Sequence, residues 1–145
     1  MIEINEPGPK ISEADIALLE DESRARLPDT YRQFLLLNNG GIPSPDIVDV
    51  TDAPGSPTDV QVFFGIGRHI ESSDLFWNLR LIEERYPDRH ILPIACDSMG
   101  NLFCLRTSNS GWFNVAYCDL SDPAGTLYEV AENFDAFLNK IRPWE

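Results

Sequence analysis

Residues 91–105, ILPIACDSMGNLFCL, place the strongest constraint on how this chain folds. Two apolar runs flank the stretch DSMGN, whose Asp, Gly and Asn residues are typical of a turn, so the segment predicts a β-hairpin. Both arms are apolar at nearly every position, which means that both faces of the hairpin have to be covered. We therefore expect helices on one face and the rest of the core on the other.

Two helices are predicted near the start of the chain. The first begins after Ser12, which forms a capping box with Asp15, and runs through EADIALLEDESRA. The second begins with Pro28 in its first turn, where the missing N–H costs nothing. Its apolar residues recur at helical spacing, and Leu36 and Leu37 broaden the apolar stripe. That breadth indicates cover on more than one side of the second helix.

The second helix ends at NNGG, residues 38–41. A phosphate-binding loop carries its glycines before a helix, so that free N–H groups point at the anion. Here the glycines follow the helix, where a residue with positive φ ends it and caps its last carbonyls. NNGG is therefore interpreted as a helix stop.

Two further helices and several strands complete the prediction. A third helix begins near Ser72 or Ser73, with Asp74 in its first turn, and ends before Pro87; Asn133 caps the last one. Residues 60–67 predict a central strand, residues 112–120 a further strand and residues 126–131 a last or edge strand. Residues 43–59 predict a proline-rich loop that contains the short strand IVDV. Short turns between strands, with helices grouped at the ends, predict one α+β domain over residues 1–145, with about four helices packed on a mainly antiparallel sheet.

The chain is strongly acidic, with 24 Asp and Glu residues against 11 Lys and Arg residues and a net charge of −13. Such a surface repels nucleic acid and anionic membranes, and it attracts basic partners. Ordinary solubility explains the charge equally well. No base lies between Arg32 and Arg68, and the acids of this stretch are the candidate partner-binding residues: Asp46, Asp49, Asp52 and Asp59.

The N-terminal stretch MIEINEPGPK lacks the basic and apolar regions of a signal peptide, and no apolar run approaches the length that spans a bilayer. The three cysteines form no CxxC pair. We therefore expect a cytoplasmic protein with reduced, buried thiols. The sequence leaves its oligomeric state open.

Catalytic candidates are few. His69 and His90 are isolated, so no zinc motif is present, and we expect no metal and no cofactor. His90, Cys96 and Asp97 could form a nucleophilic site on paper, but Cys96 lies in an apolar strand without a neighbouring cation to lower its pKa. Asp97 could act as an acid or a metal ligand, or it could close the hairpin as an Asx-turn residue, which is the interpretation that we adopt. The glycines of FGIG mark a bulge or a strand end. We expect no catalytic residues.

Three aromatic residues near the end of the chain are candidate interface anchors: Trp112, Phe113 and Trp144. Packing in the core or at an edge is the alternative for each of them.

Three blocks of the sequence resemble the SUKH superfamily, which includes bacterial immunity proteins and fungal cell-wall-assembly regulators. LPDTYRQFLLLNNGG is similar to its signature helix, ILPIACDSMGNLFCL to its second block and LYEVAENFDAFLNKI to its closing block, in the family's order. The resemblance implies an α+β fold, no catalysis and mostly architectural roles for the matched residues: Leu27, Pro28, Tyr31, Phe34, Gly40, Gly41, Asp97, Gly100 and Asn101.

The resemblance and the charge together predict a binding module that neutralises a basic toxin domain, such as a nuclease. The alternative is a regulatory or scaffolding module that binds a cellular protein, as the fungal relatives suggest. A cysteine-dependent enzyme is a third alternative.

Overall fold

The computed structural model describes residues 2–108 and 111–144, and the side chains of Ser108 and Phe113 lie outside the described part. Its largest sheet is antiparallel and five-stranded, with the strands in the order β5 (Val62–Phe63), β6 (Ile91–Cys96), β7 (Leu102–Ser108), β8 (Gly111–Cys118) and β9 (Leu127–Ala131). The hairpin predicted for residues 91–105 is β6 and β7, which pair antiparallel. The predicted strands around residues 112–120 and 126–131 are confirmed as β8 and β9.

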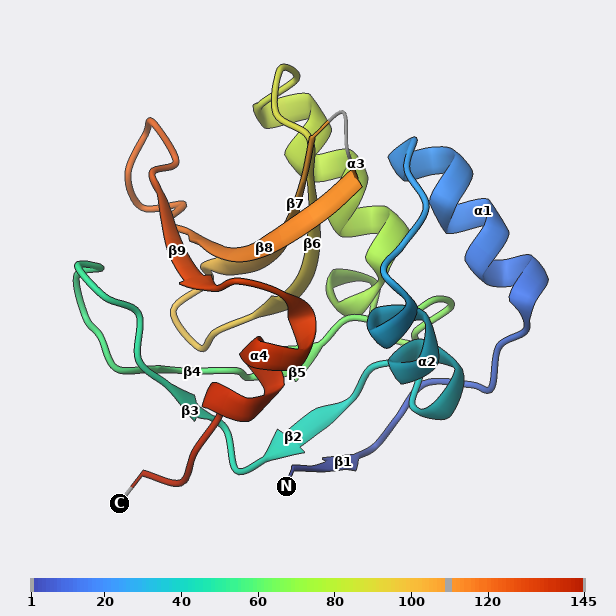
Figure 1. The fold of residues 1–145 in the computed structure, drawn as a ribbon, viewed down its shortest axis with the longest axis horizontal. Coiled ribbons are helices and arrows are strands. Elements are labelled where there is room, and N and C mark those ends of the chain that lie inside the picture. The colour runs from blue at the N-terminus through green and yellow to red at the C-terminus, as the bar shows by residue number, and fades with distance from the viewer. Residues whose placement is uncertain (1, 109–110, 145) are drawn as a thin grey trace.

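The helices are α1 (Glu13–Ser23), α2 (Asp29–Leu37), α3 (Leu75–Arg85) and α4 (Phe134–Lys140), with a short 3₁₀ turn at η1 (Glu71–Ser73). The α+β fold is therefore confirmed (Figure 1). Pro28 flanks α2 as its N-cap, one residue outside the helix in which it was expected. Asp74 likewise caps α3 from outside and accepts a hydrogen bond from Trp77 N at 3.2 Å.

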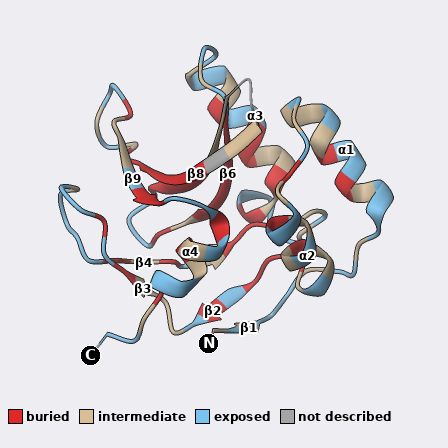
Figure 2. Ribbon diagram, viewed as in Figure 1, coloured by how far each residue is buried: buried red, intermediate tan, exposed pale blue. Residues whose placement is uncertain are grey.

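The core forms where helices meet the largest sheet. Helix α3 contacts β6, and α4 contacts β8 and β9. Phe137 of α4 lies 5.2 Å from Phe103 of β7, measured between ring centroids, and Phe134 lies 5.0 Å from Tyr31 of α2. The central strands β6, β7 and β8 are buried along most of their length, as Figure 2 shows for β6 and β8. Cover on both faces of the hairpin explains why both of its arms are apolar.

The strand predicted over residues 60–67 is neither central nor long. It forms only β5, which is an edge strand of the five-stranded sheet. Beyond it lies a two-stranded ribbon of β1 (Glu3–Asn5) and β2 (Ile42–Ser44), which the sequence did not predict. Gly41 and Phe63 exchange two backbone hydrogen bonds, of 3.0 and 2.8 Å, which join this ribbon to β5.

The NNGG stretch is confirmed as a helix stop, but it caps α2 differently from the prediction. Asn38 ends the helix in an extended conformation, and positive φ first occurs at Gly40 (φ 74°). A Cβ on Gly40 would lie 2.6 Å from the Phe63 carbonyl oxygen, so close backbone packing requires glycine here. The Asn39 side chain accepts a hydrogen bond from Ile66 N at 2.7 Å and so fixes the chain after β5.

The proline-rich stretch contains a second small hairpin. Strand β3 (Ile47–Val48), expected as part of IVDV, pairs with β4 (Thr58–Asp59), which the sequence did not predict. Figure 1 shows this hairpin and α1 at opposite sides of the molecule. In the part of the chain that the structure describes, no helix has the length and apolar character needed to cross a membrane.

Candidate functional site: an acidic hairpin

The four candidate partner-binding acids lie together on the segment that we call the acidic hairpin, residues 46–59. Asp46 precedes β3, Asp59 ends β4, and Asp49 and Asp52 lie in the connection between the two strands. Asp49 and Asp52 are exposed, whereas Asp46 and Asp59 are half-buried. Asp52 has a positive φ of 69°, as a turn residue at the tip. Pairing of β3 with β4 places Asp59 opposite Ile47, which follows Asp46, so these two acids lie at the same end of the hairpin.

Two of these acids are bound within the chain. Arg142 binds Asp49 through two hydrogen bonds of 2.9 Å, and this contact lowers the pKa of the Asp49 carboxyl. Asp59 accepts a hydrogen bond from Ser98 N at 2.9 Å and another from the Ser98 hydroxyl. Among the described residues, Asp46 and Asp52 make no side-chain hydrogen bond or ion pair. The charge available to a partner is therefore concentrated at Asp46 and Asp52.

The acidic hairpin is anchored at its base. Val48 and Val50 are fully buried, as is Val60, which directly follows the hairpin. Ile47 exchanges two backbone hydrogen bonds, of 2.9 and 2.7 Å, with Arg142 near the end of the chain. The sequence contained no local signal for the Arg142 contacts, because Arg142 lies 93 residues after Asp49.

Asp97 closes the β6–β7 hairpin as predicted. Its Oδ1 accepts hydrogen bonds from Met99 N at 3.0 Å and Asn101 N at 2.8 Å, the pattern of an Asx turn. Its Oδ2 accepts hydrogen bonds from the hydroxyls of Thr58, at 2.8 Å, and Tyr117. Because Asp97 is only 1% exposed, these four donors replace water around a buried carboxylate.

The Asp97 cluster also connects the acidic hairpin to the sheet. Thr58 belongs to β4, whereas Tyr117 belongs to β8. Asn101 donates a hydrogen bond to the Tyr117 hydroxyl at 2.8 Å, and burial raises the pKa of Tyr117. Sequence reasoning missed Thr58 and Tyr117 because neither is close to Asp97 along the chain. Asp97 therefore holds β4 and β8 together through the hydroxyls of Thr58 and Tyr117.

The other residues matched in the resemblance lie in the core or at tight turns. Leu27 and Tyr31 are buried at the α1–α2 connection and in α2, and Phe34 is half-buried. Gly40 and Gly41 lie between α2 and β2, and Gly100 (φ 86°) lies in the turn between β6 and β7.

The nucleophilic site considered for His90, Cys96 and Asp97 does not assemble. His90 directly precedes β6 and Cys96 ends it, so roughly 20 Å of extended chain separates them. Burial, with smaller contributions from Asp97 and Asp59, raises the pKa of Cys96 to about 11. A thiol with that pKa is protonated at neutral pH. The described residues contain no group of three or more His, Cys, Asp or Glu side chains placed to hold a metal ion.

The candidate aromatic anchors differ in exposure. Trp144 is 67% exposed. Trp112 is half-buried, and its Nε1 is buried without a hydrogen-bond partner in the described part of the chain. The Phe113 side chain lies outside the described residues.

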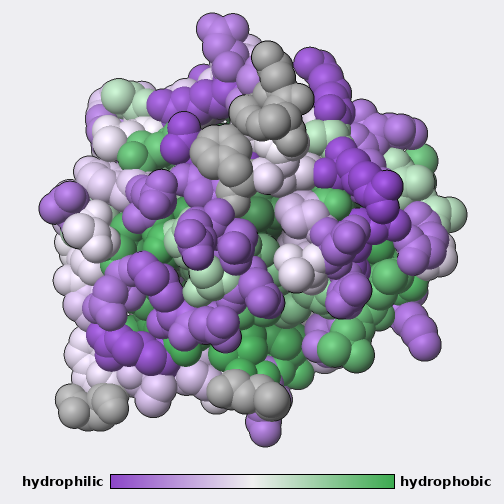
Figure 3. All heavy atoms as spheres, viewed as in Figure 1, coloured by the Kyte–Doolittle hydropathy of each residue, from purple (hydrophilic) through white to green (hydrophobic). Residues whose placement is uncertain are grey.

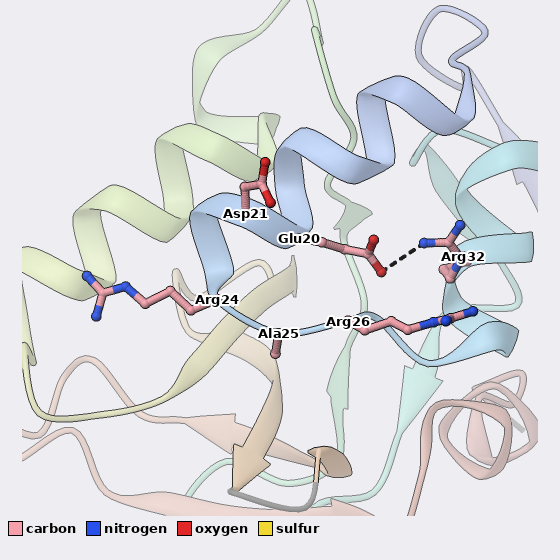
Figure 4. A pocket seen from close by; sticks show the side chains of 6 residues that line it. All are labelled: Glu20, Asp21, Arg24, Ala25, Arg26 and Arg32. Atoms are coloured by element: carbon pink, nitrogen blue, oxygen red, sulfur yellow. Dashed lines mark hydrogen bonds and ion pairs between the residues drawn. The ribbon is translucent and has the colours of Figure 1, made fainter.

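A hollow of about 510 Å³ lies where α1 leads into α2 (Figure 4). The Glu20 carboxylate points toward Arg32 and accepts hydrogen bonds from its Nη1 at 2.8 Å and from Leu27 N at 2.7 Å. This contact raises the pKa of Arg32. Arg24 projects away from that pair, whereas Arg26 extends to the side of Arg32 and forms an ion pair of 3.8 Å with Asp29. The hollow therefore surrounds an internal ion pair that fixes the connection between the two helices.

The fold and these placements agree with a comparison against protein families. The model of the SMI1 / KNR4 family (SUKH-1) matches residues 10–140, which is most of the 145-residue chain. The matched region includes all four helices, the five-stranded sheet and the acidic hairpin. A comparison with curated proteins finds no match. The chain belongs to the SMI1 / KNR4 family (SUKH-1).

Proposed function

We propose that this protein is an immunity protein, a non-catalytic module that neutralises a cognate toxin domain by binding it through the acidic hairpin. Membership of SUKH-1 is consistent with a protein-binding role. The net charge of −13 favours a partner with a basic surface. Nuclease toxins have such surfaces because they must hold phosphates, so a nuclease is the kind of toxin that we expect.

The observation that carries the proposal is that the acidic hairpin has an anchored base and an exposed tip. Its base is held by buried valines and by Arg142, while Asp52 is exposed at its tip. A surface that is already ordered loses little conformational entropy when a partner binds. Clustered acids also steer a basic partner, which speeds association at low salt and less so at physiological salt, where the Debye length is about 8 Å.

The test is co-expression with any toxin domain that is found encoded next to this gene, in a host that the toxin alone kills. Survival, together with a purified complex whose association rate falls steeply with salt, is the expected result. Death of the host, with no complex formed by the purified proteins, would reject the immunity role. Recovery of a metabolic or cell-wall protein as the stable partner would favour the regulatory alternative.

Charge reversal tests whether the acidic hairpin makes the contact. The double variant Asp46→Lys/Asp52→Lys is expected to slow association at least tenfold at low salt. Asp21→Lys/Glu84→Lys is the matched control, because it changes the net charge equally at exposed positions of α1 and α3. Equal effects of the two double variants would mean that net charge alone matters and that this hairpin does not make the contact.

A further inference from the structure

Leu37, the last residue of α2, is 82% exposed. The breadth of the apolar stripe on α2 predicted cover on more than one side, and for Leu37 that prediction is wrong within this chain. A large apolar side chain left in water at the edge of a depression is characteristic of a surface that a partner covers.

Leu37 borders an apolar groove of about 590 Å³. Three elements build it, since β1 supplies Ile4, α2 supplies Phe34 and Leu37, and the end of α4 supplies Leu138. Phe34 and Leu37 share a face because they are three residues apart on a helix. The complete lining is Ile2, Ile4, Phe34, Leu37, Asn38, Leu138, Asn139 and Ile141.

None of these lining residues is charged. In a chain with 24 acids and 11 bases, an uncharged apolar surface of this size stands apart from the rest. Figure 3 shows hydrophobic atoms gathered near α4 and the β1–β2 ribbon, next to hydrophilic atoms on the side of the acidic hairpin. An apolar centre beside a charged rim is the usual anatomy of a protein-binding surface.

The groove is continuous with the acidic hairpin. Ile141, which lines the groove, is followed by Arg142, whose backbone pairs with Ile47 of β3. Asp49 then binds the Arg142 side chain. One partner can therefore contact the apolar groove and the acidic hairpin at the same time.

We propose that this groove is the anchor site for a basic protein segment, which inserts one or two large apolar side chains between flanking Lys or Arg residues. The apolar residues would bury against Phe34, Leu37 and Leu138, and the flanking cations would face the acidic hairpin. Charge selects this occupant over a second copy of the chain, because two copies with a net charge of −13 each repel one another. Buried apolar anchors at the centre of an interface carry most of its binding energy.

This inference deepens the proposed function, since it names the chemistry of the partner segment, but its test does not need the toxin. The probe is a displayed library of random 12-residue peptides, selected on the purified full chain. The expected result is a consensus with a Leu, Phe or Trp flanked by Lys or Arg. Peptides with that consensus are expected to bind the Leu37→Asn variant about thirtyfold more weakly than the unmodified chain.

Leu18→Asn is the matched control, because Leu18 is also an exposed helical leucine, at 59%, and lies outside the groove. It is expected to bind the selected peptides as the unmodified chain does. Selection without basic residues, failure to enrich any peptide, or equal binding by Leu37→Asn would overturn the inference. So would a concentration-dependent dimer, measured by sedimentation, that Leu37→Asn abolishes, because the occupant would then be a second copy.

The two proposals fail in different ways. If the toxin is neutralised equally well by Leu37→Asn and no peptide is enriched, the groove assignment is wrong while the immunity role stands. If peptides select the groove but no neighbouring toxin is neutralised, the groove stands and the immunity role is wrong.

Discussion

Arg142 binds both carboxylate oxygens of Asp49, through Nε–Oδ2 and Nη2–Oδ1 hydrogen bonds of 2.9 Å each. A two-point contact of this kind fixes the orientation of both groups. It holds the connection between β3 and β4 against the C-terminal segment, and it reduces the negative charge that Asp49 offers to a partner. Charge reversal at Asp46 and Asp52 is therefore the sharper test of partner binding.

The Asp49 contact predicts a pH dependence. Arg142 lowers the pKa of Asp49 in the folded chain below its value of about 3.9 in the unfolded chain. The folded state therefore gains stability from this pair above about pH 4 and loses it as the pH falls through the folded pKa. Carboxylate titration by NMR is expected to show a depressed pKa for Asp49 that returns to the ordinary range in Arg142→Gln.

Asp122 supplies the control for that titration. Its pKa is lowered by hydrogen bonds from Thr126 and from Ala124 N, neither of which involves Arg142. It is expected to titrate identically in Arg142→Gln and the unmodified chain. An unchanged pKa for Asp49 in the variant would contradict the ion pair.

The Asp97 cluster predicts opposite effects for the same substitution at two tyrosines. Tyr117→Phe removes a donor from the buried Asp97 carboxylate and an acceptor from Asn101, and it is expected to lower the free energy of unfolding by about 2–3 kcal/mol. Tyr31→Phe removes a buried hydroxyl that has no partner among the described residues, so it is expected to be neutral or slightly stabilising. Urea unfolding measures both. A larger loss for Tyr31→Phe than for Tyr117→Phe would reverse the assignment.

Substitution by alanine is expected to lower the free energy of unfolding by different amounts at two glycines with positive φ. At Gly40 (φ 74°) the added Cβ meets the Phe63 carbonyl oxygen at 2.6 Å, whereas at Gly100 (φ 86°) nothing lies within 4 Å. Gly100→Ala is expected to cost about 1 kcal/mol of backbone strain. Gly40→Ala adds a backbone clash and is expected to cost at least about 2 kcal/mol more, measured as the shift in urea midpoint. Equal costs would mean that β5 can move away from Gly40.

The raised pKa of Cys96 predicts that its thiol reacts slowly with disulfide reagents. With a pKa of about 11, Cys96 is about 0.1% thiolate at pH 8. The greater intrinsic nucleophilicity of a high-pKa thiolate offsets part of that deficit, so Cys96 is expected to react with a disulfide reagent at least about tenfold more slowly than an ordinary thiol. The same reaction in urea gives the unperturbed rate. Rapid labelling of Cys96 in the folded chain would return the cysteine-dependent alternative to consideration.

The sequence predicted the features that are determined by residues close together in the chain. The β6–β7 hairpin followed from two apolar arms around DSMGN, and the Asx turn of Asp97 followed because its acceptors serve N–H groups two and four residues ahead. The position of β5 did not follow. β-branched and aromatic residues predict a strand, but whether it is central or at an edge depends on which distant segments pair with it.

The same reason applies to the smallest strands and to the candidate site. β1 and β2 have three residues each, and β2 contains Pro43, so neither gives a clear strand pattern. The acids of residues 46–59 were found from composition, but Arg142 and Ser98, which bind two of them, are far away in the chain. The apolar groove had one signal in the sequence, namely that the apolar stripe of α2 is broadened at Leu37.

The division of the acidic hairpin into a buried base and an exposed tip has a consequence for how this protein can change over generations. Residues 51–57 contribute no fully buried side chain, whereas Val48, Val50 and Val60 on either side of them are buried in the core. Lengthening such a tip costs little, since each doubling of a loop adds only about 0.6 kcal/mol of closure entropy. The tip can therefore change in length and sequence while the buried base, which keeps the chain folded, stays the same.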